Sequence, residues 1–322
     1  MSSIQKVSIV CPFYNEEKIL NKAIINLAKN LRTLRHEHEI ILVNDGSTDK
    51  SLKIAKEISS SFKNLKIISY PKNQGRGFAL KHGIDNSVGD IIITTEIDLS
   101  WGDDIVHKFI NAFEKEPTAD IIIASPHLSG GRYINVPFKR VFLSKVGNFL
   151  LRTGQGYDIT MYTGMTRAYK ANKIKSLFLD EKGKEFHLEV ISKAKFFNYK
   201  IIEIPSQLEW KDHKLISNKN SSNKRKSSTN LSKVIKSHSI YAFVSAPFRY
   251  ILPISVFFLG LSLFFMIYAI YNFINSIPSV FLLLISMVAM CMFLITFSIS
   301  MISFQNSNLM TELWKIRKIL KK

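Results

Sequence analysis

The chain has 322 residues, of which 46% are hydrophobic, and a formal net charge of +19 at pH 7. This length allows one α/β domain of about 200 residues and a membrane region, and it excludes a second large soluble domain. Cys11 and Cys291 are the only cysteines, which excludes a disulfide framework and a zinc cluster.

Short apolar segments and helical patterns alternate from the amino terminus. Residues 1–6 lead straight into the apolar residues 7–10, which are too few for the hydrophobic region of a signal peptide, so we expect none. Strands are predicted at residues 7–11, 39–44, 65–69, 90–95 and 120–124, and a helix at 16–34. This order predicts a mainly parallel sheet with helices on both faces and ligands beyond the carboxyl ends of its strands.

Two of the predicted strands end in motifs that suit nucleotide binding. The sequence YNE at residues 14–16 follows the first strand, and NDGS at residues 44–47 closes the second. Asp45 could accept hydrogen bonds from a base or a ribose, while the glycine after it permits the turn. Ser47 or Asp49 alternatively caps the next helix, and the two roles are compatible.

The acidic pair Glu96 and Asp98 is the candidate metal site. It follows the strand predicted at residues 90–95, and its spacing puts both carboxylates on the same side of an extended chain. Hard oxygen ligands with open coordination positions suit Mg²⁺ or Mn²⁺ held jointly with a diphosphate. Such a pair can also be a simple turn cap. Asp103 and Asp104 are expected in the first turn of the following helix.

Other polar residues give weaker signals. The glycine-bearing turn at residues 73–81, NQGRGFALK, lacks the spacing of dinucleotide-binding folds and of P-loops, so a dehydrogenase or a kinase is not supported. His127, His187 and His213 show no metal-ligand spacing, and we interpret all three as structural.

Residues 137–152 predict a basic amphipathic helix. Pro137 suits the first helical position. The apolar members of its stripe are Phe138, Val141, Phe142, Val146, Phe149 and Leu150, and Lys139, Arg140, Lys145 and Arg152 interrupt it. Such a helix can lie in a membrane interface or pack as an ordinary helix with a solvated face. The apolar runs that follow favour the interfacial interpretation.

Two long apolar runs, at residues 248–274 and 280–304, predict transmembrane helices. No Asp, Glu, Lys or Arg occurs from Ile251 through Phe304. Each run reaches about 25 residues, which is enough to cross a hydrocarbon core of about 30 Å. Two buried helices of a soluble protein would need a polar face, so we predict antiparallel spans joined by a tight turn.

Positive charge lies on the outer ends of these two runs. Residues 211–250 hold nine Lys and Arg against one Asp, and residues 305–322 hold five against one Glu. The positive-inside rule then predicts a multi-pass protein of the cell membrane with both termini in the cytoplasm. Anionic lipid head groups explain charge at this place, so no nucleic-acid partner is expected.

In their order and spacing, these motifs resemble glycosyltransferases of family 2 with the GT-A fold, specifically the branch that transfers hexoses to polyprenyl (dolichyl) phosphates. The resemblance covers nearly the whole chain. It rests on CPFYNEE at residues 11–17, VNDGSTD at 43–49, NQGRG at 73–77, GD at 89–90 and EIDLS at 96–100, which resembles the D-x-D metal motif.

On the donor side, the resemblance implies a nucleoside diphosphate sugar and Mg²⁺ or Mn²⁺ held by Glu96, Asp98 and Ser100. The donor-binding residues that it implies are Pro12, Tyr14, Glu16, Asp45, Lys81, Arg225 and Lys226, the last two in a basic loop that closes over the diphosphate. Glu96 stands where the family has Asp, and Ser100 stands where some relatives have Gln.

On the acceptor side, SGGRY at residues 129–133 and PFKR at 137–140 resemble the polyprenyl-phosphate branch. The resemblance implies that Arg132, Arg140 and Ser144 hold the acceptor phosphate and act in catalysis with Asp98. The link between the two motifs is shorter than in the family and lacks its glycines. TGMTRAY at 163–169, Glu189 and EIP at 203–205 fit the segments that follow in the family.

The predicted organisation is therefore α/β, a GT-A Rossmann-like sheet followed by two transmembrane helices. Its parts are a cytoplasmic domain at 1–212 that includes the interfacial helix 137–152, a basic juxtamembrane segment at 213–247, spans at 248–274 and 280–304, and a basic amphipathic tail at 305–322.

The predicted function is the inverting transfer of a hexose from a nucleoside diphosphate sugar to a polyprenyl phosphate, undecaprenyl or dolichyl, at the cytoplasmic membrane face. One alternative is a sugar or lipid hydroxyl acceptor, with Glu189 as the nearest candidate base, although the Q-x-x-R-W of polysaccharide synthases is absent. The other is a protein that binds sugar nucleotide or lipid phosphate without turnover. The sugar, the base, the isoprenoid length and a homo-oligomeric state stay open.

Overall fold

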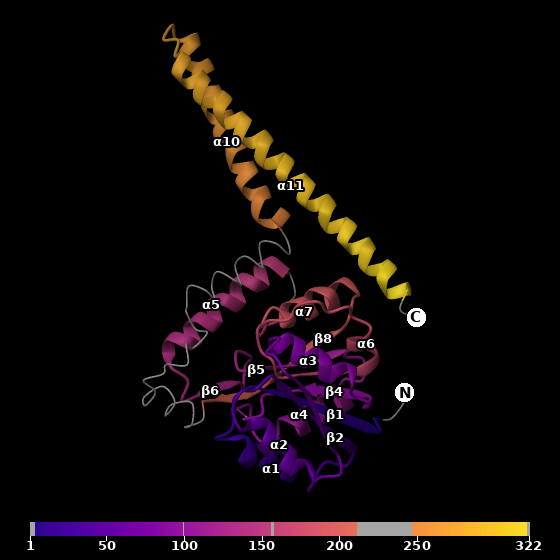
Figure 1. Cartoon of the computed structure of the whole chain (residues 1–322). Helices are drawn as coiled ribbons and strands as arrows, with labels where there is room; N and C mark the ends of the chain where they lie inside the picture. The colour runs from indigo at the N-terminus through magenta and orange to yellow at the C-terminus, as the bar shows by residue number, and fades with distance from the viewer. Residues whose placement is uncertain (1–3, 99, 156–157, 211–246, 321–322) are drawn as a thin grey trace. The chain divides into compact units, whose positions relative to one another are not determined.

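The computed structural model describes residues 4–98, 100–155, 158–210 and 247–320. The chain divides into two compact units, an α/β unit and a helical hairpin. The α/β unit contains β1 (Lys6–Phe13), α1 (Leu20–Leu31), β2 (Glu37–Asp45), α2 (Ser51–Ser59), β3 (Leu65–Tyr70), α3 (Arg76–Asp85), β4 (Ile91–Thr94), α4 (Ile105–Lys115), β5 (Ile121–Ser125), β6 (Arg132–Ile134), α5 (Phe138–Gln155), β7 (Arg167–Lys170), α6 (Ala171–Lys175), α7 (Phe186–Phe196), β8 (Ile201–Pro205) and β9 (Gln207–Glu209) (Figure 1).

A seven-stranded sheet in the order β3-β2-β1-β4-β7-β5-β8 forms the centre of this unit. The pairs β1/β2, β1/β4, β2/β3 and β5/β8 are parallel, whereas β7 runs antiparallel to β4 and β5. The predicted mainly parallel sheet is confirmed. The strand β7 was not predicted, because four residues are too few for a strand pattern to stand out. A separate parallel pair joins β6 and β9.

The core lies between the sheet and its helices. Continuous buried apolar runs such as Ile40–Val43 and Ile91–Ile93 occur because helices cover both faces of the sheet. Burial of each such side chain contributes about 1.5–3 kcal/mol. Helix α3 packs on β1 and β2 at Gly83, where a Cβ atom would lie 2.3 Å from Val10 Cγ1. Only glycine permits this close approach.

The strand register brings the carboxyl ends of β1, β2 and β4 to one edge of the sheet. Phe13 at the end of β1 pairs with Asn44 near the end of β2, and Val10 of β1 pairs with Thr94 at the end of β4. The three polar motifs follow these strands, so they emerge as neighbours. This is the edge at which parallel sheets bind ligands.

Helix α5 exposes an aromatic face. Phe138, Phe142 and Phe149 are 81%, 56% and 65% exposed, whereas Asn148 on another face of the helix is 4% exposed. A helix packed in the ordinary way would bury its aromatic side chains and expose its amides. The helix buries Leu151 on its other side, and its location in a membrane interface stays a prediction. The helix ends at Gln155, three residues beyond the predicted end.

The second unit is a hairpin of α10 (Pro247–Ile274) and α11 (Val280–Leu320), which lie side by side (Figure 1). By length and composition, α10 and the Val280–Trp314 part of α11 are each apolar enough to cross a membrane. Only 11% of the most apolar window of each helix is buried, whereas the core helix of a soluble protein would be mostly buried. The segment predicted as a separate tail from residue 305 continues α11, because it contains no Gly or Pro.

Two serines join the helices of the hairpin. Ser262 Oγ donates to the carbonyl oxygen of Ser286, and Ser286 Oγ donates to that of Ser262, both at 3.0 Å. Within a membrane, polar groups need partners inside the protein, and small residues allow helices to approach closely. This reciprocal pair fixes the register of α10 against α11.

Candidate active site

The loop after β1 is fastened to the loop after β2. Asn15 has a positive φ of 54°, and its backbone N–H donates to Ser47 Oγ at 3.0 Å. The N–H of Glu16 donates to Ser51 Oγ at 2.8 Å. Tyr14 is 42% exposed beside this junction. The YNE motif therefore has a defined backbone, with an aromatic ring accessible to a ligand at the sheet edge.

Asp45 organises the neighbouring glycine turn. Its carboxylate accepts hydrogen bonds from Tyr70 OH at 2.8 Å, from Asn73 Nδ2 at 3.0 Å and from the backbone N–H of Gln74 at 2.8 Å. Burial and the contact with Asp45 raise the pKa of Tyr70, so its hydroxyl remains a donor. The side chain predicted to bind a base or ribose already holds this turn in place. Gly46 has a φ of +64°, and a Cβ there would lie 2.4 Å from the Asn73 nitrogen.

Ser47 and Asp49 were the alternative candidates for capping the helix after β2, and only Asp49 contacts the start of α2. Asp49 Oδ1 accepts a hydrogen bond from the backbone N–H of Ser51, the first residue of α2, at 2.9 Å. Ser47 instead accepts from the loop after β1. Asp103 and Asp104 were predicted in the first turn of this helix, but both precede α4, which begins at Ile105 and has no acidic residue in its first turn. Asp104, immediately before the helix, forms an ion pair with Lys108 at 2.9 Å.

The acidic motif after β4 brings its three predicted ligands together. The Ser100 hydroxyl lies 3.3 Å from Glu96 Oε2 and also donates to Asp98 Oδ1. The backbone N–H of Ser100 donates to Asp98 Oδ1 at 3.0 Å. Two carboxylates and a hydroxyl thus converge, and all are hard oxygen donors of the kind that Mg²⁺ and Mn²⁺ prefer.

This donor set fits a divalent ion shared with a diphosphate. Among the described residues, no group of three His, Cys, Asp or Glu side chains could hold a metal ion alone. Mg²⁺ is usually bound by one or two carboxylates, with substrate phosphates and water at its other positions. Glu96 and Asp98 match that arrangement, because further positions would be left for phosphate oxygens.

A segment absent from the sequence predictions links this motif to α5. The backbone N–H of Glu209 donates to the carbonyl oxygen of Ser100 at 2.7 Å. The guanidinium carbon of Arg140 lies 4.2 Å from the ring centroid of the adjacent Trp210, which is a cation–π contact. Arg140 is thereby tied to the chain that touches the acidic motif. Neither residue 209 nor residue 210 carries a sequence signal for this contact, which is purely tertiary.

The three predicted acceptor residues have different surroundings. Arg140 and Ser144 are four residues apart on α5, so they share a helix face. Arg132 Nε donates to Gln207 Oε1 at 2.9 Å across the β6/β9 pair. Neighbouring side chains of a strand point to opposite faces, so Arg132 lies opposite to Tyr133, whose hydroxyl is 3.4 Å from Ser144 Oγ. In this structure Arg140 and Ser144 lie together on α5, whereas Arg132 is held by Gln207 on the β6/β9 pair.

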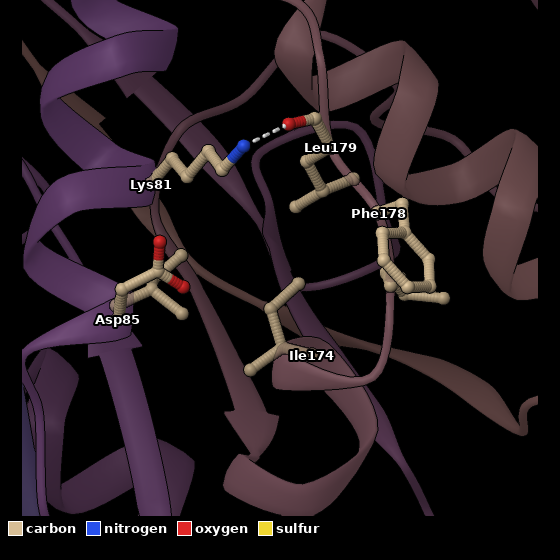
Figure 2. A pocket seen from close by; sticks show the side chains of 7 residues that line it. Lys81, Asp85, Ile174, Phe178 and Leu179 are labelled. Atoms are coloured by element: carbon tan, nitrogen blue, oxygen red, sulfur yellow. Dashed lines mark hydrogen bonds between the residues drawn. The ribbon is translucent and has the colours of Figure 1, made fainter. Parts of the chain in front are cut away.

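Lys81 contacts the segment that follows α6. Its ammonium nitrogen donates to the carbonyl oxygen of Leu179 at 2.7 Å (Figure 2). The side chain lines a cavity of about 50 Å³ between α3 and the segment after α6, together with Ile84, Asp85, Ile174, Leu177, Phe178 and Leu179. A cavity of this size holds no nucleotide sugar, since small-molecule sites are about 300–1,000 Å³. Of the other implied donor residues, Arg225 and Lys226 lie outside the described residues, as does His213.

Glu189, the candidate base for a hydroxyl acceptor, is committed to the fold. It is 6% exposed and accepts hydrogen bonds from the backbone N–H groups of Asp180 and Glu181 at 3.0 Å. It also pairs with Lys193 Nζ at 2.6 Å. His187 on the same helix is 1% exposed, in agreement with its structural interpretation.

His127, interpreted as structural from the sequence, contacts Ser144, one of the three predicted acceptor residues. Its Nε2 is 3.2 Å from Ser144 Oγ and 2.9 Å from Tyr133 OH. Burial and the charge of Lys145 lower the pKa of His127. The sequence carried no spacing signal for this residue, because its partners are 6 and 17 positions away on different elements.

The fold and the acidic edge define the class of this protein. The chain belongs to glycosyl transferase family 2, whose family model matches residues 8–178. The predicted resemblance to this family is confirmed. A solved structure of glucosyl-3-phosphoglycerate synthase from Mycobacterium tuberculosis, in complex with Mn²⁺, UDP-glucose and phosphoglyceric acid, superposes with a TM-score of 0.51. At 16% identity, over 74% of this chain and 79% of that one, this likeness concerns the fold alone.

Two curated relatives have names that match the predicted branch. Dolichol-phosphate mannosyltransferase of Pyrococcus furiosus is 29% identical over 204 residues, which are 62% of this chain and 55% of that protein. Undecaprenyl-phosphate 4-deoxy-4-formamido-L-arabinose transferase of Proteus mirabilis is 30% identical over 177 residues, 54% of this chain and 52% of that protein. The matches thus span about half the length of these relatives.

Proposed function

We propose that this protein transfers a hexose from a nucleoside diphosphate sugar to a polyprenyl phosphate at the cytoplasmic face of a membrane, with inversion at the anomeric carbon. The observation that carries the proposal is the convergence of Glu96, Asp98 and Ser100 at the ligand edge, in a chain that ends in two apolar helices. The names of the two relatives agree with this choice of acceptor.

The chemical step needs no strong general base. An oxygen of the acceptor phosphate, already an anion near neutral pH, attacks the anomeric carbon and forms the new C–O bond. The bond from that carbon to the leaving diphosphate breaks, and its electron pair leaves with the nucleoside diphosphate. The task of the protein is therefore to position two anions and to balance their charge.

Residues at the sheet edge would handle the donor. Tyr14 and Glu16 belong to the loop after β1, and Pro12 is the penultimate residue of that strand. This loop is fastened to the one after β2, the strand that ends at Asp45, whose carboxylate holds the glycine turn. A divalent ion on Glu96, Asp98 and Ser100 would supply positive charge that stabilises the leaving diphosphate. Arg225 and Lys226 of the basic loop remain part of the proposal as further cations for the diphosphate.

Residues of α5 would hold the acceptor. Arg140 and Ser144 share one helix face, and the aromatic residues Phe138, Phe142 and Phe149 are exposed on the same helix. A helix with basic residues and exposed aromatic side chains suits the boundary between head groups and acyl chains. The lipid would then present its phosphate to Arg140 and Ser144 while its isoprenoid chain remains in the membrane. In this proposal Arg132 moves from Gln207 toward the phosphate when the lipid binds.

The hydrogen bonds that Glu189 makes within the fold weigh against a hydroxyl acceptor. A sugar or lipid hydroxyl needs a carboxylate that can take its proton. Glu189 accepts two backbone N–H groups and the ammonium of Lys193, so using it as a base would cost these hydrogen bonds. A phosphate acceptor requires no such base.

The test is a transfer assay with detergent-solubilised protein. UDP- and GDP-sugars are offered with Mn²⁺ or Mg²⁺, each with and without undecaprenyl phosphate, and nucleoside diphosphate release is measured beside sugar in the organic phase. Release that requires the lipid phosphate and matches sugar in the lipid phase supports the proposal. Metal-dependent donor binding with no release from any pair would assign the protein to the class that binds without turnover.

A further inference from the structure

The imidazole of His127 meets hydroxyl groups from two other elements. His127 follows β5, Tyr133 belongs to β6 and Ser144 belongs to α5. His127 Nε2 lies 2.9 Å from Tyr133 OH and 3.2 Å from Ser144 Oγ, and the two hydroxyl oxygens are 3.4 Å apart. The rings of His127 and Tyr133 also meet edge to face, with centroids 5.4 Å apart. Three polar atoms from three elements therefore converge on one point.

A chain of hydrogen bonds anchors His127 to the sheet. Its backbone N–H donates to Ser125 Oγ at 3.2 Å, and Ser125 Oγ lies 2.6 Å from Thr160 Oγ1. Thr160 Oγ1 in turn donates to Glu203 Oε1 of β8 at 3.0 Å, and the Thr160 N–H donates to Glu203 Oε2 at 2.7 Å. The backbone from which the imidazole extends is thus held from the core of the unit, because every link of this chain leads back to β5 or β8.

Ser144 is also fixed from its other side. Asn148 Nδ2 lies 2.7 Å from the Ser144 carbonyl oxygen and 3.3 Å from its hydroxyl. Asn148 Oδ1 accepts a hydrogen bond from the backbone N–H of Tyr162 at 2.6 Å. The Ser144 hydroxyl therefore lies between an amide and an imidazole that are both immobilised by the fold.

The charged side chains that neighbour Ser144 along α5 are positive. Lys145 follows Ser144 and lowers the pKa of His127 in addition to the effect of burial, which keeps the imidazole neutral near pH 7. Arg140 lies one turn earlier on α5. A cationic surrounding with hydroxyl and imidazole groups at its centre suits an anion with several oxygen acceptors, such as a phosphate monoester.

We propose that His127 is a positioning residue for the acceptor, which holds the Tyr133 hydroxyl and thereby orients the Ser144 hydroxyl toward the lipid phosphate. The inference rests on the proposed function and adds a residue to its acceptor site. When Nε2 accepts the Tyr133 proton, the Ser144 hydroxyl is left to donate to a phosphate oxygen. His127 thereby acts through Ser144, and it need not touch the substrate.

The experiment measures KM for both substrates in full-length protein, with undecaprenyl phosphate as acceptor and the active sugar nucleotide as donor. His127→Ala is expected to raise the acceptor KM five- to tenfold, as for the loss of about one hydrogen bond. The donor KM should change less than twofold. His127→Gln should recover most of the loss, because its amide oxygen can reach the place of Nε2 and accept the Tyr133 proton, whereas His127→Asn reaches only the place of Nδ1.

A double-mutant cycle separates positioning from a general effect on the fold. If His127 acts through Ser144, His127→Ala should add little to the acceptor defect of Ser144→Ala, so the two effects are not additive. The control is His107→Ala. His107 lies on α4, outside the acceptor cluster, and its Nε2 contacts Thr33 Oγ1 at 3.1 Å. The KM values of this variant should equal those of the wild type.

Several outcomes would overturn the inference. These are an unchanged acceptor KM in His127→Ala, equal losses for both substrates with a lowered melting temperature, or additive effects in the cycle. A failure of the proposed function is recognised separately, since the wild-type protein would then transfer no sugar to undecaprenyl phosphate at all.

Discussion

At the scale of the residue, the acidic motif after β4 is the part of the site where sequence and structure agree most directly. Glu96, Asp98 and Ser100 lie within five positions of one another, and they are hydrogen-bonded in the fold. A local motif of this kind needs only a strand end to bring its side chains together. Residues whose partners are distant in the chain, such as His127, could not be assigned this way.

Asp98→Asn should reduce transfer by at least about a hundredfold, because it removes charge from the group proposed to balance the leaving diphosphate. The amide can still accept the bond from the Ser100 N–H, so the fold should survive, as circular dichroism and melting temperature would show. EDTA should abolish wild-type transfer, and Mn²⁺ should restore it. Asp103→Asn, at an exposed carboxylate of the next segment, is the control. Wild-type rates in Asp98→Asn would remove this residue from the site.

Arg140→Ala should raise the KM for undecaprenyl phosphate about tenfold and leave the donor KM nearly unchanged, since a charged hydrogen bond to phosphate is lost. Steady-state kinetics with each substrate varied in turn provides the measurement. Lys139→Ala on the same helix removes an equal charge and should have a smaller effect. A defect confined to the donor KM would count against the assignment of Arg140 to the acceptor.

At the scale of the element, the amino ends of the strands are joined by one buried carboxylate. Glu39 of β2 accepts hydrogen bonds from Ser8 Oγ of β1 at 2.6 Å and from the Val88 N–H before β4 at 2.7 Å. It also pairs with Lys66 of β3 at 2.7 Å. Burial alone would raise the pKa of Glu39, but these partners outweigh burial and lower it. This end of the sheet is therefore built for stability, opposite to the edge that carries the site.

Glu39→Gln should lower the free energy of unfolding by about 1–2 kcal/mol near pH 7. A carboxylate with a lowered pKa stabilises the fold fully above its unfolded value of 4.5, and the effect is lost as pH falls through the lower folded value. The difference between variant and wild type should therefore shrink in acid. Denaturant unfolding of the detergent-solubilised protein at pH 7 and pH 3 measures both. Glu37→Gln, at the exposed start of the same strand, should show no such difference.

Longer elements were also easier to predict than short ones. The strands β1 and β2 and the helix α1 follow the apolar patterns of their segments, with ends shifted by a few residues. The strands β6 and β9 have three residues each, and they exist only because they pair with one another. Their pairing sets Arg132 beside Gln207 and brings the last residue of β9, Glu209, to the acidic motif. No local pattern in the sequence predicts the pairing of β6 with β9.

At the scale of the whole molecule, we expect the hairpin to cross the membrane and the α/β unit to remain in the cytoplasm. Single cysteines at Lys18→Cys and Asn275→Cys, in a chain without Cys11 and Cys291, test this with a membrane-impermeant maleimide. Intact cells should label only Asn275→Cys, because the uncharged turn between α10 and α11 faces outward by the positive-inside rule. Lys18→Cys should react only after lysis.

The opposite labelling pattern would reverse the proposed orientation, and equal labelling of both positions before lysis would remove the span. Extraction with alkaline carbonate serves as the control for insertion, since a peripheral protein is released and an inserted one is retained. Both variants lie outside the proposed donor and acceptor sites, so transfer activity should be preserved and can report that the chain is folded.

The sequence by itself determined the sheet, the two apolar helices, the acidic motif and the family, because each depends on local periodicity, composition or motif order. Tertiary structure alone decided which of the predicted site residues already hold hydrogen bonds within the fold. Asp45 holds the glycine turn, Lys81 donates to the carbonyl oxygen of Leu179, and His127 joins Ser144. These outcomes follow from strand pairing and from the contacts of β6, β9 and α5, which join residues too distant in the chain for any local pattern to report.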